Sequence, residues 1–561
     1  MVYSYTINMP YLDDYTFIVD CINLKIAHLT PGQLLTTVFY PHGEHIIVFA
    51  RLVAMLDYLL EGELNFRTLF FIGNATLLGT IWVLYRLARQ GGLSVLQTLP
   101  IFWLLLQPQF YENTLTWAIC ALQHVPALFF AFSAFYLLSQ SSSRSFWGSL
   151  PLAFLATFSN GNGLAVLGVG LMVVTVCRSR QYTLIWLLFA AVSGGIFYYF
   201  SQFSAAAPVS GNLSHPFRVL GGFFLMSGSM GLLFTRSLTA LSLIGIGLTM
   251  VFVLVSGTAL IRRIAPAYWL RYAPDWLRNR IGSWSVPTGQ PVSISLIAGY
   301  LYLVITLAGI SFARGQGWHY GLILPRFIWF ATVSLVVGYL MVMLWVKPDY
   351  RKTIGWSVVC FSIAFNTFAY WSSFAEVKTI NQSLLSDFHN WRENRLLITM
   401  PANKRGNDSF YATLMEAAIR EGVYKMPPAP LDLTNRRQTS QAALKALVTK
   451  DSSFSLDERR YRYLTIDPTA LAPLSQQPFN QTAAYLLLRS ARHTFLWPIN
   501  QSRTKLSLFL VTGHPLQAGP LATIMTDMLP AASYQLGVCY AQKGQWITKY
   551  SAETMQVSAS N

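Results

Sequence analysis

The sequence predicts a mainly α-helical, polytopic membrane protein, a bundle of about 10–11 spans followed by a C-terminal extracytoplasmic α/β domain. Hydrophobic residues make up 53% of the 561 residues and charged residues only 11%, whereas a soluble domain carries about a quarter charged residues. Apolar stretches of helix length follow one another from residue 64 to residue 373, and polar sequence begins after them. Much of the net charge of +17 lies between these stretches, where it indicates membrane loops rather than a nucleic-acid partner.

The apolar stretches are long enough, or nearly long enough, to cross the hydrocarbon core of a membrane. They lie at about 64–87, 93–107, 117–139, 146–158, 161–177, 182–201, 237–260, 293–311, 325–346 and 353–373. Two further segments have a different interpretation. Residues 46–60 contain Arg51 and Asp57, which favours an interfacial helix, and the glycine-containing run 219–234 is expected to be re-entrant.

Lysine and arginine are concentrated in alternate loops, which predicts the orientation of the chain, because cytoplasmic loops carry an excess of these residues. The cytoplasmic side then receives Arg86 and Arg89, Arg144, Arg178 and Arg180, the loop from Arg262 to Arg280, and Lys347 to Lys352. The aromatic loop that begins at Arg262 is interpreted as a segment lying on anionic lipid. The outer side receives residues 1–63, 107–113, 159–163, 201–218, 311–326 and everything after about 374.

This pattern divides the chain into two predicted domains. Residues 1–375 form the transmembrane domain, with residues 1–63 as an outer catalytic loop. Residues 376–561 form an extracytoplasmic mixed α/β domain of ordinary size. Within it the sequence predicts a helix at 379–395 and strands at 461–466, 484–488 and 505–512.

Asp13 and Asp14 are the first candidates for chemistry. An Asp pair before an apolar helix is often a helix N-cap. Here, however, the pair is flanked by aromatic residues, and acidic residues are scarce in this half of the chain. Neighbouring carboxylates also couple electrostatically, which raises the pKa of one of them. One of the two could therefore act as a base that deprotonates a sugar hydroxyl.

Arg314 and Arg326 are candidates for binding a phosphate. Both lie near the outer ends of predicted spans, and a guanidinium group can bind phosphate through two parallel hydrogen bonds. The alternative is that each side chain reaches toward lipid headgroups. His319 lies between them and could assist, although a lone histidine is more often structural.

Further polar residues in the outer segments are expected to support these groups: Glu44, His45, Arg51, Asn160 and Asn162. Glu44 and His45 could bind a divalent cation together with an Asp. They could equally orient the Asp pair or cap the helix that begins near residue 46. Asn160 and Asn162 could hydrogen-bond a sugar, or could simply form the turn that Asn and Gly favour.

Taken together, these features resemble the GT-C superfamily of integral-membrane glycosyltransferases that use polyprenyl-phosphate sugars. The resemblance rests on the Asp pair in an outer segment, on the segment Pro41-His42-Gly43-Glu44-His45, on Ser159-Asn160-Gly161-Asn162-Gly163-Leu164, and on Arg314 with Arg326. It covers residues 1–375 and depends mainly on topology. The superfamily has a helix before its Asp pair, and residues 1–9 lack the features of a signal peptide. The N-terminal segment either crosses the membrane unaided as a short loop ahead of the first span or follows a further helix ahead of residue 1, and we expect the further helix.

The resemblance implies an inverting glycosyltransferase at the extracytoplasmic face of a bacterial inner membrane. Its donor would be a polyprenyl-phosphate-linked sugar and its acceptor a cell-surface glycan such as lipopolysaccharide. Asp13 or Asp14 would be the general base, and Arg314, Arg326 and His319 would bind the departing phosphate. Two alternatives remain: an oligosaccharide ligase of related fold, and a transporter or flippase, which would favour charged or broken segments at mid-membrane.

Overall fold

The structure is a computed structural model of the 561-residue chain. It describes residues 1–27, 29–204, 214–264, 291–314, 319–346, 348–400, 410–427, 447–456, 459–471, 484–518, 521–542 and 545–558. Most of the predicted lipid-facing loop after Arg262 lies outside these residues.

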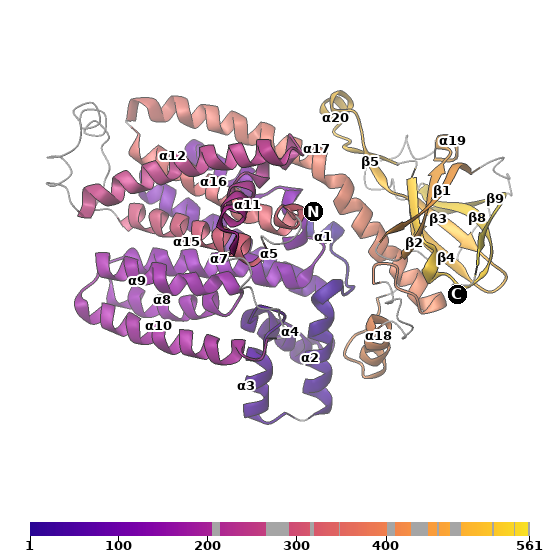
Figure 1. The fold of residues 1–561 in the computed structure, drawn as a ribbon, viewed down its shortest axis with the longest axis horizontal. Helices are drawn as coiled ribbons and strands as arrows, with labels where there is room; N and C mark the ends of the chain where they lie inside the picture. The colour runs from indigo at the N-terminus through magenta and orange to yellow at the C-terminus, as the bar shows by residue number, and fades with distance from the viewer. Residues whose placement is uncertain are drawn as a thin grey trace.

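A helical bundle forms the larger part of the molecule, and its helices run side by side along the long axis in Figure 1. Within the described residues, seven helices are long and apolar enough to cross a membrane. They are α5 (Phe66–Gln90), α7 (Ala118–Ser139), α10 (Arg180–Ser201), α12 (Leu238–Ile264), α15 (Pro291–Arg314), α16 (Pro325–Trp345) and α17 (Pro348–Asn394). This agrees with a multi-pass membrane protein.

The remaining helices of the bundle are shorter than an ordinary span. They are α6 (Val95–Leu105), α8 (Ser143–Thr157), α9 (Ala165–Cys177) and α11 (Pro216–Ser227), the last followed by the 3-10 turn η5 (Ser229–Leu233). The predicted spans 93–107, 146–158 and 161–177 are therefore helical but short, and the re-entrant prediction for 219–234 falls on α11 and η5. Local sequence explains where several helices begin: Ser94 and Gln97, for example, form a capping box at the start of α6.

Residues 1–63 are largely helical, whereas the sequence predicts an outer loop with one helix. Helix α1 (Val2–Tyr5) and the 3-10 turn η1 (Leu12–Asp14) precede α2 (Tyr15–Ile26), α3 (Pro31–Phe39) and α4 (Val48–Glu61). Figure 1 shows α2, α3 and α4 together at one end of the bundle, beside the C-terminal part of the molecule. The expected interfacial helix 46–60 corresponds to α4.

Helix α17 joins the two parts of the chain. The sequence predicted a span at 353–373 and a separate helix at 379–395, but the structure has one continuous helix of 47 residues. No proline or glycine interrupts it between Gly355 and its end. Its last turns are buried on two sides. Asn390 exchanges hydrogen bonds of 2.8 Å with the backbone of Leu496 in the C-terminal domain, and Phe388 and Trp391 lie in an apolar cluster that includes Phe17 of α2.

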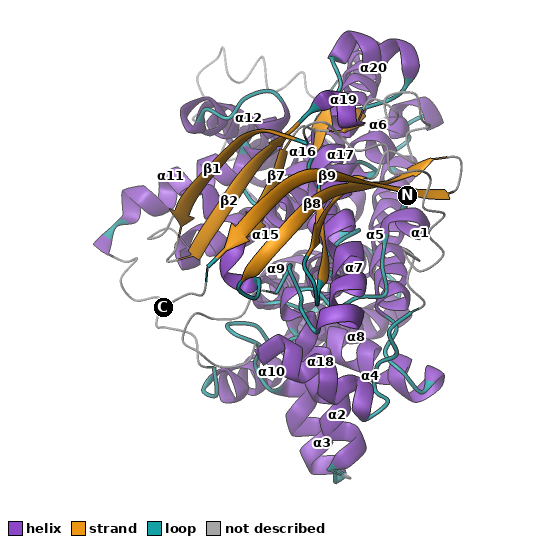
Figure 2. Ribbon diagram, turned by 90° about the vertical axis from the view of Figure 1, so that its right-hand side faces the viewer, coloured by secondary structure: helices purple, strands orange, loops and turns teal. Residues whose placement is uncertain are grey.

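The C-terminal part is rich in antiparallel β-structure rather than mixed α/β. One sheet has the order β1-β2-β7 and another the order β4-β3-β8-β9. Figure 2 shows β8 and β9, which pair with each other, running side by side. The strands are β1 (Val448–Leu456), β2 (Arg459–Ile466), β3 (Ala484–Arg489), β4 (Thr494–Pro498), β7 (Leu521–Met525), β8 (Ala532–Gln542) and β9 (Gln545–Val557). A small pair consists of β5 (Gln501–Arg503) and β6 (Leu516–Ala518), and the short helices α18 (Phe410–Arg420) and α19 (Pro468–Leu471) complete this part.

One predicted strand is wrong. Residues 505–512 alternate apolar and polar side chains only in part, and they form the helix α20 (Leu506–Thr512). The segment connects β5 to β6, which pair with each other, so it has no neighbouring strand to extend. Gly513 adopts φ 70° and ends the helix in the left-handed conformation that glycine favours.

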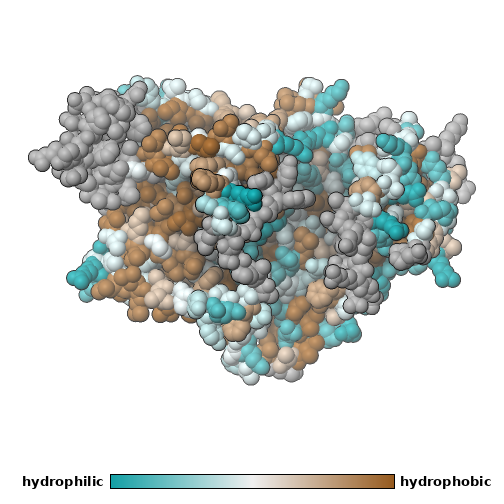
Figure 3. Space-filling model, viewed as in Figure 1, coloured by the Kyte–Doolittle hydropathy of each residue, from teal (hydrophilic) through white to brown (hydrophobic). Residues whose placement is uncertain are grey.

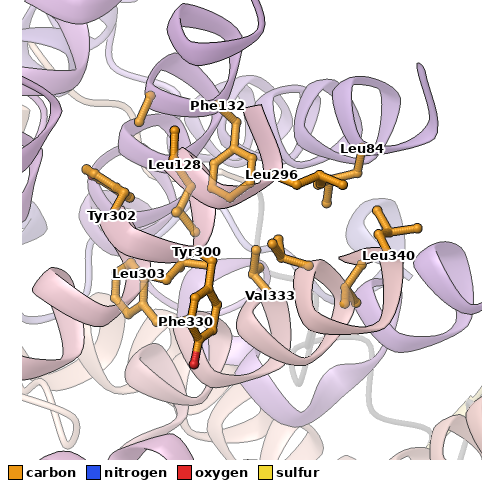
Figure 4. Close-up of a cluster of buried hydrophobic side chains, with 14 of the residues drawn as sticks. Leu84, Leu128, Phe132, Leu296, Tyr300, Tyr302, Leu303, Phe330, Val333 and Leu340 are labelled. Carbon is orange, nitrogen blue, oxygen red and sulfur yellow. The ribbon is translucent and has the colours of Figure 1, made fainter. Parts of the chain in front are cut away.

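The bundle is held together by a large apolar core. Figure 4 shows Phe132 of α7, Tyr302 of α15 and Phe330 of α16 meeting in this cluster. The surface has a matching division: hydrophobic residues cover much of the visible face of the bundle, and hydrophilic residues gather over the C-terminal domain (Figure 3).

Candidate active site

A cavity of about 1150 Å³ lies where the N-terminal segment meets α7, α9, α15 and α16. Its walls bring together seven of the residues singled out from the sequence: Asp13, Glu44, His45, Asn160, Asn162, Arg314 and Arg326. These residues come from segments up to 313 positions apart (326 − 13). Leu164, Leu301, Ile305 and Ile310 give the same cavity an apolar side.

Asp13 faces this cavity. Its side chain is 50% exposed, and its Oδ2 lies 3.8 Å from Nε2 of His42. Nδ1 of that histidine in turn lies 3.1 Å from Oγ1 of Thr16 on α2, which fixes the plane of the ring. The backbone directly before Asp13 is strained, because Leu12 adopts φ 50°, a conformation that costs a β-carbon residue about 1–2 kcal/mol.

Asp14 has a different environment from its neighbour. It is fully buried and accepts hydrogen bonds from the backbone N–H groups of Ile119 at 2.7 Å, Tyr11 at 3.1 Å and Ala118 at 3.3 Å. Ala118 and Ile119 begin α7, so this carboxyl group caps a helix that is distant in sequence. Burial raises the pKa of Asp14 to about 8, whereas the three backbone donors lower it. Asp14 does not line the cavity.

The turn after α3 places three more polar groups at the cavity. His42 and His45 exchange backbone hydrogen bonds of 2.7 and 3.0 Å, and Gly43 between them adopts φ 54°. Oε1 of Glu44 lies 3.3 Å from Nε2 of His45 and 3.0 Å from NH2 of Arg314. The His45 hydrogen bond, together with Arg314, lowers the pKa of Glu44 to about 2.

Arg314 ends α15 and Arg326 begins α16, so both guanidinium groups reach the same end of the bundle. Each lies over the ring of Phe327, at 5.2 and 5.1 Å from its centre. Arg326 also lies over Trp117 at 5.1 Å and forms an ion pair with Glu112 at 2.9 Å. Both arginines are therefore positioned by aromatic rings, and each has one carboxylate partner.

The turn at 160–162 forms another wall. Gly161 donates its backbone N–H to Nδ1 of His45 at 3.3 Å, and an added β-carbon there would lie 2.9 Å from that atom. Asn162 donates from Nδ2 to Tyr302 and Thr306 on α15, each at 3.3 Å. Its Oδ1 is buried and has no hydrogen-bond partner among the described residues. Oδ1 of Asn160 accepts a hydrogen bond from the backbone N–H of Gly161 at 2.8 Å. This is the turn-forming role that the sequence offers as an alternative to sugar binding.

Arg51 does not reach this cavity. It is buried on α4 and donates from Nε to Oδ2 of Asp20 on α2 at 2.8 Å. A second cavity of about 530 Å³ lies beside this ion pair. Asp13 and His42 line both cavities and thus stand between them.

No family model, curated protein or solved structure matches this chain. The function must therefore be inferred from the cavity and its residues.

His319 begins the 3-10 turn η6 (His319–Leu322), between the two arginines in sequence, and its side chain lies outside the described residues. In the part of the chain that is described, no three His, Cys, Asp or Glu side chains form a group that could hold a metal ion. The divalent cation considered for Glu44 and His45 stays a prediction.

Three residues of the cavity were not selected from the sequence: His42, Gln123 and His124. Glu112, the partner of Arg326, was not selected either. His124 lies within an apolar span and bonds through Nδ1 to Oδ1 of Asn113 at 2.9 Å, while Asn113 donates to the backbone of Arg326 at 2.8 Å. A histidine inside an apolar span was a usable indication, because ionisable residues in such segments are often functional.

Proposed function

We propose that the chain is an inverting glycosyltransferase that moves a sugar from a polyprenyl-phosphate donor to a cell-surface glycan at the extracytoplasmic face of a bacterial inner membrane. The observation that carries this proposal is the larger cavity, in which Asp13 shares one space with Arg314 and Arg326. A transferase of this kind needs a base for the acceptor hydroxyl and cations for the phosphate that leaves.

The lining of the cavity suits a lipid-linked donor. The two arginines and Asn162 supply donors for phosphate and sugar oxygens, whereas Leu301 and Ile305 supply an apolar wall for the first isoprene units. A site with a few fixed polar groups on an otherwise apolar surface is typical of small-molecule binding. In the donor complex the phosphate would take the place of Glu44 or Glu112 beside its arginine.

The reaction would proceed by direct displacement. The acceptor hydroxyl gives its proton to Asp13 while its oxygen forms a bond to the anomeric carbon. The bond from that carbon to the phosphate oxygen breaks, and its electron pair stays on the lipid phosphate. Arg314 and Arg326 stabilise the added negative charge, and attack from the face opposite the leaving group inverts the configuration.

The second cavity supports the same assignment from the acceptor side. It meets the first cavity at Asp13 and His42, so an acceptor there would reach the base without entering the donor space. Its lining includes Tyr40, Asn23 and Tyr411, which offer aromatic surface and hydrogen bonds. Tyr411 belongs to α18, which gives the C-terminal part a place in acceptor binding.

The test is sugar transfer by the protein reconstituted in lipid nanodiscs. The donors are undecaprenyl phosphates that carry radiolabelled hexoses, pentoses or amino sugars, and the acceptor is purified cell-envelope glycan. We expect Asp13→Asn to lower the turnover rate by about 10²–10⁴-fold, and Arg314→Ala by about 10²–10³-fold. Asp451→Asn, a substitution of a partly exposed carboxylate on β1, is the matched control.

Full activity of a folded Asp13→Asn protein would refute the role of the base. No transfer by wild type from any of the donors, together with movement of the lipid-linked sugar across the bilayer of proteoliposomes, would favour the flippase alternative. Transfer of a whole glycan from an undecaprenyl-linked oligosaccharide, with no transfer from the single-sugar donors, would favour the ligase.

A further inference from the structure

Among the described helices and strands of the C-terminal domain, α20 is an apolar element with no buried residue. It has seven residues. The exposed fractions are 48% for Leu508, 64% for Leu510 and 85% for Val511. An isolated two-turn helix is unstable in water, and apolar side chains on all its faces would raise the cost of exposure.

The base of this helix is fixed to α17. Nε1 of Trp371 donates to the backbone oxygen of Thr504 at 2.8 Å, and the guanidinium group of Arg503 lies 5.5 Å from the centre of the same indole ring. Thr504 also donates to the backbone oxygen of His514 through Oγ1, at 2.7 Å, which closes the loop around α20. The helix is thus carried by a rigid connection and is not a loose extension.

Trp371 marks the position along the bundle where α20 is held. The apolar run of α17 extends to about residue 373, and tryptophan is enriched where a span leaves the hydrocarbon for the headgroups. Figure 1 shows α20 projecting sideways from the molecule beside α17, at the end of the bundle where that helix enters the C-terminal domain. A helix at this depth and pointing outward would meet the lipid surface around the bundle.

The charges around α20 fit that location. Arg503 and Lys505 precede it and are exposed, and no acidic residue occurs from Ile499 to Thr526. Cations beside an apolar helix are typical of segments that lie in the interface of anionic lipids. A protein partner would instead be expected to offer an apolar pocket rimmed by acids, and nothing in the described residues indicates one.

We propose that α20 is a membrane anchor of the C-terminal domain: its leucine and valine side chains enter the interface of the surrounding bilayer, and Arg503 and Lys505 contact anionic headgroups. The anchor fixes the C-terminal domain from a second side, in addition to α17. This proposal depends only on a membrane around the bundle and not on the enzymatic activity.

The test uses the full chain in nanodiscs that contain phosphatidylglycerol. Val511→benzoylphenylalanine places a photoreactive group on α20, and irradiation is followed by mass spectrometry of the peptides. We expect a lipid adduct, as at the positive control Leu188→benzoylphenylalanine on the exposed face of α10. The negative control is Ser453→benzoylphenylalanine on β1, which should give none.

Labelling at 188 without labelling at 511 would overturn the proposal, because α20 would then face water. A crosslinked dimer at 511 would also overturn it, in favour of a second copy of the chain. A second experiment needs no change at residue 511. A diazirine-bearing phospholipid should label the wild-type peptide that contains Leu508 and Leu510. Leu510→Asp should reduce that labelling and leave the labelling of α10 unchanged.

Discussion

Asp14→Ala should destabilise the protein, whereas Asp13→Ala should not. The substitution at Asp14 removes the acceptor of three backbone N–H groups in a site without solvent. A buried donor without a partner costs about 1–3 kcal/mol, and loss of an N-cap alone costs about 0.5–2 kcal/mol. At about 1 kcal/mol for each donor, the free energy of unfolding should fall by about 3 kcal/mol.

The expected change in melting temperature follows from chain length. An unfolding entropy of about 2.1 cal/mol/K per residue gives about 1.2 kcal/mol/K for 561 residues, so a loss of about 3 kcal/mol lowers Tm by about 2.5 °C. Asp13 is half-exposed, and its replacement should change stability by no more than about 0.5 kcal/mol. Thermal unfolding in one detergent, followed by intrinsic fluorescence, measures both variants.

The pH dependence gives a second comparison. Because the pKa of Asp14 is raised to about 8, the folded chain holds this proton more tightly than the unfolded chain does. The stability that this contributes is complete below about pH 4 and is lost as the pH rises through 8. The difference in Tm between wild type and Asp14→Ala should therefore be larger at pH 6 than at pH 8.5. If Asp14→Ala kept the Tm of the wild type, or if Asp13→Ala lowered Tm by more than Asp14→Ala, the assignment of a structural role to Asp14 and not to Asp13 would be refuted. Asp14→Asn retains one acceptor oxygen and should give an intermediate loss if the alanine variant cannot be purified.

Three other substitutions test the walls of the cavity. Arg326→Lys keeps the positive charge but loses the planar contacts with two aromatic rings. The transfer rate should fall about tenfold, while Tm in thermal unfolding should fall by no more than about 2 °C. Gly163→Ala would place a β-carbon 1.7 Å from a backbone oxygen of α8, and it should lower stability by about 1–3 kcal/mol or more; Gly168→Ala, with no atom within 4 Å of the added carbon, is the control that should leave Tm unchanged. The pKa of Glu44 is lowered to about 2, so its ion pairs stabilise the fold above about pH 4.5 and are lost as the pH falls towards 2. Glu44→Gln should therefore flatten the dependence of Tm on pH between about 5 and 3. An unchanged slope would contradict the ion pairs.

Hydrophobic periodicity predicted most helices of the bundle because each apolar stretch is separated from the next by a polar or glycine-rich turn. Where this periodicity failed to predict the structure, contacts with distant parts of the chain decided it. No local break separates residue 373 from residue 379, so α17 continues through the predicted domain boundary. Residues 505–512 have no strand to pair with, and their leucines therefore form α20. Helices α2 and α3 were missed because they contain polar residues and lie outside the apolar spans.

The candidate site was predictable in its chemical types but not in its distances. Sequence position alone treats Asp13 and Asp14 as equivalent, and only the packing of η1 against the start of α7 separates them. Arg51 lies outside the larger cavity because its partner, Asp20, lies on a helix that was not predicted. Glu112 was overlooked because its role appears only when the segment 108–113 that contains it meets the first turn of α16.

The carboxylate partners of Arg314 and Arg326 explain how two guanidinium groups can line one partly apolar cavity at low electrostatic cost. A buried guanidinium group without a partner is costly, whereas one that exchanges one anion for another keeps most of its electrostatic energy. Glu44 pairs with Arg314 and Glu112 with Arg326, so each cation is compensated before a ligand enters. The phosphodiester of a lipid-linked sugar carries one negative charge and the lipid phosphate that leaves carries two, so two arginines bind the departing group more strongly than the donor. Both guanidinium groups contact the ring of Phe327 and line the larger cavity, so in the proposed reaction both can stabilise the charge that develops as the lipid phosphate leaves.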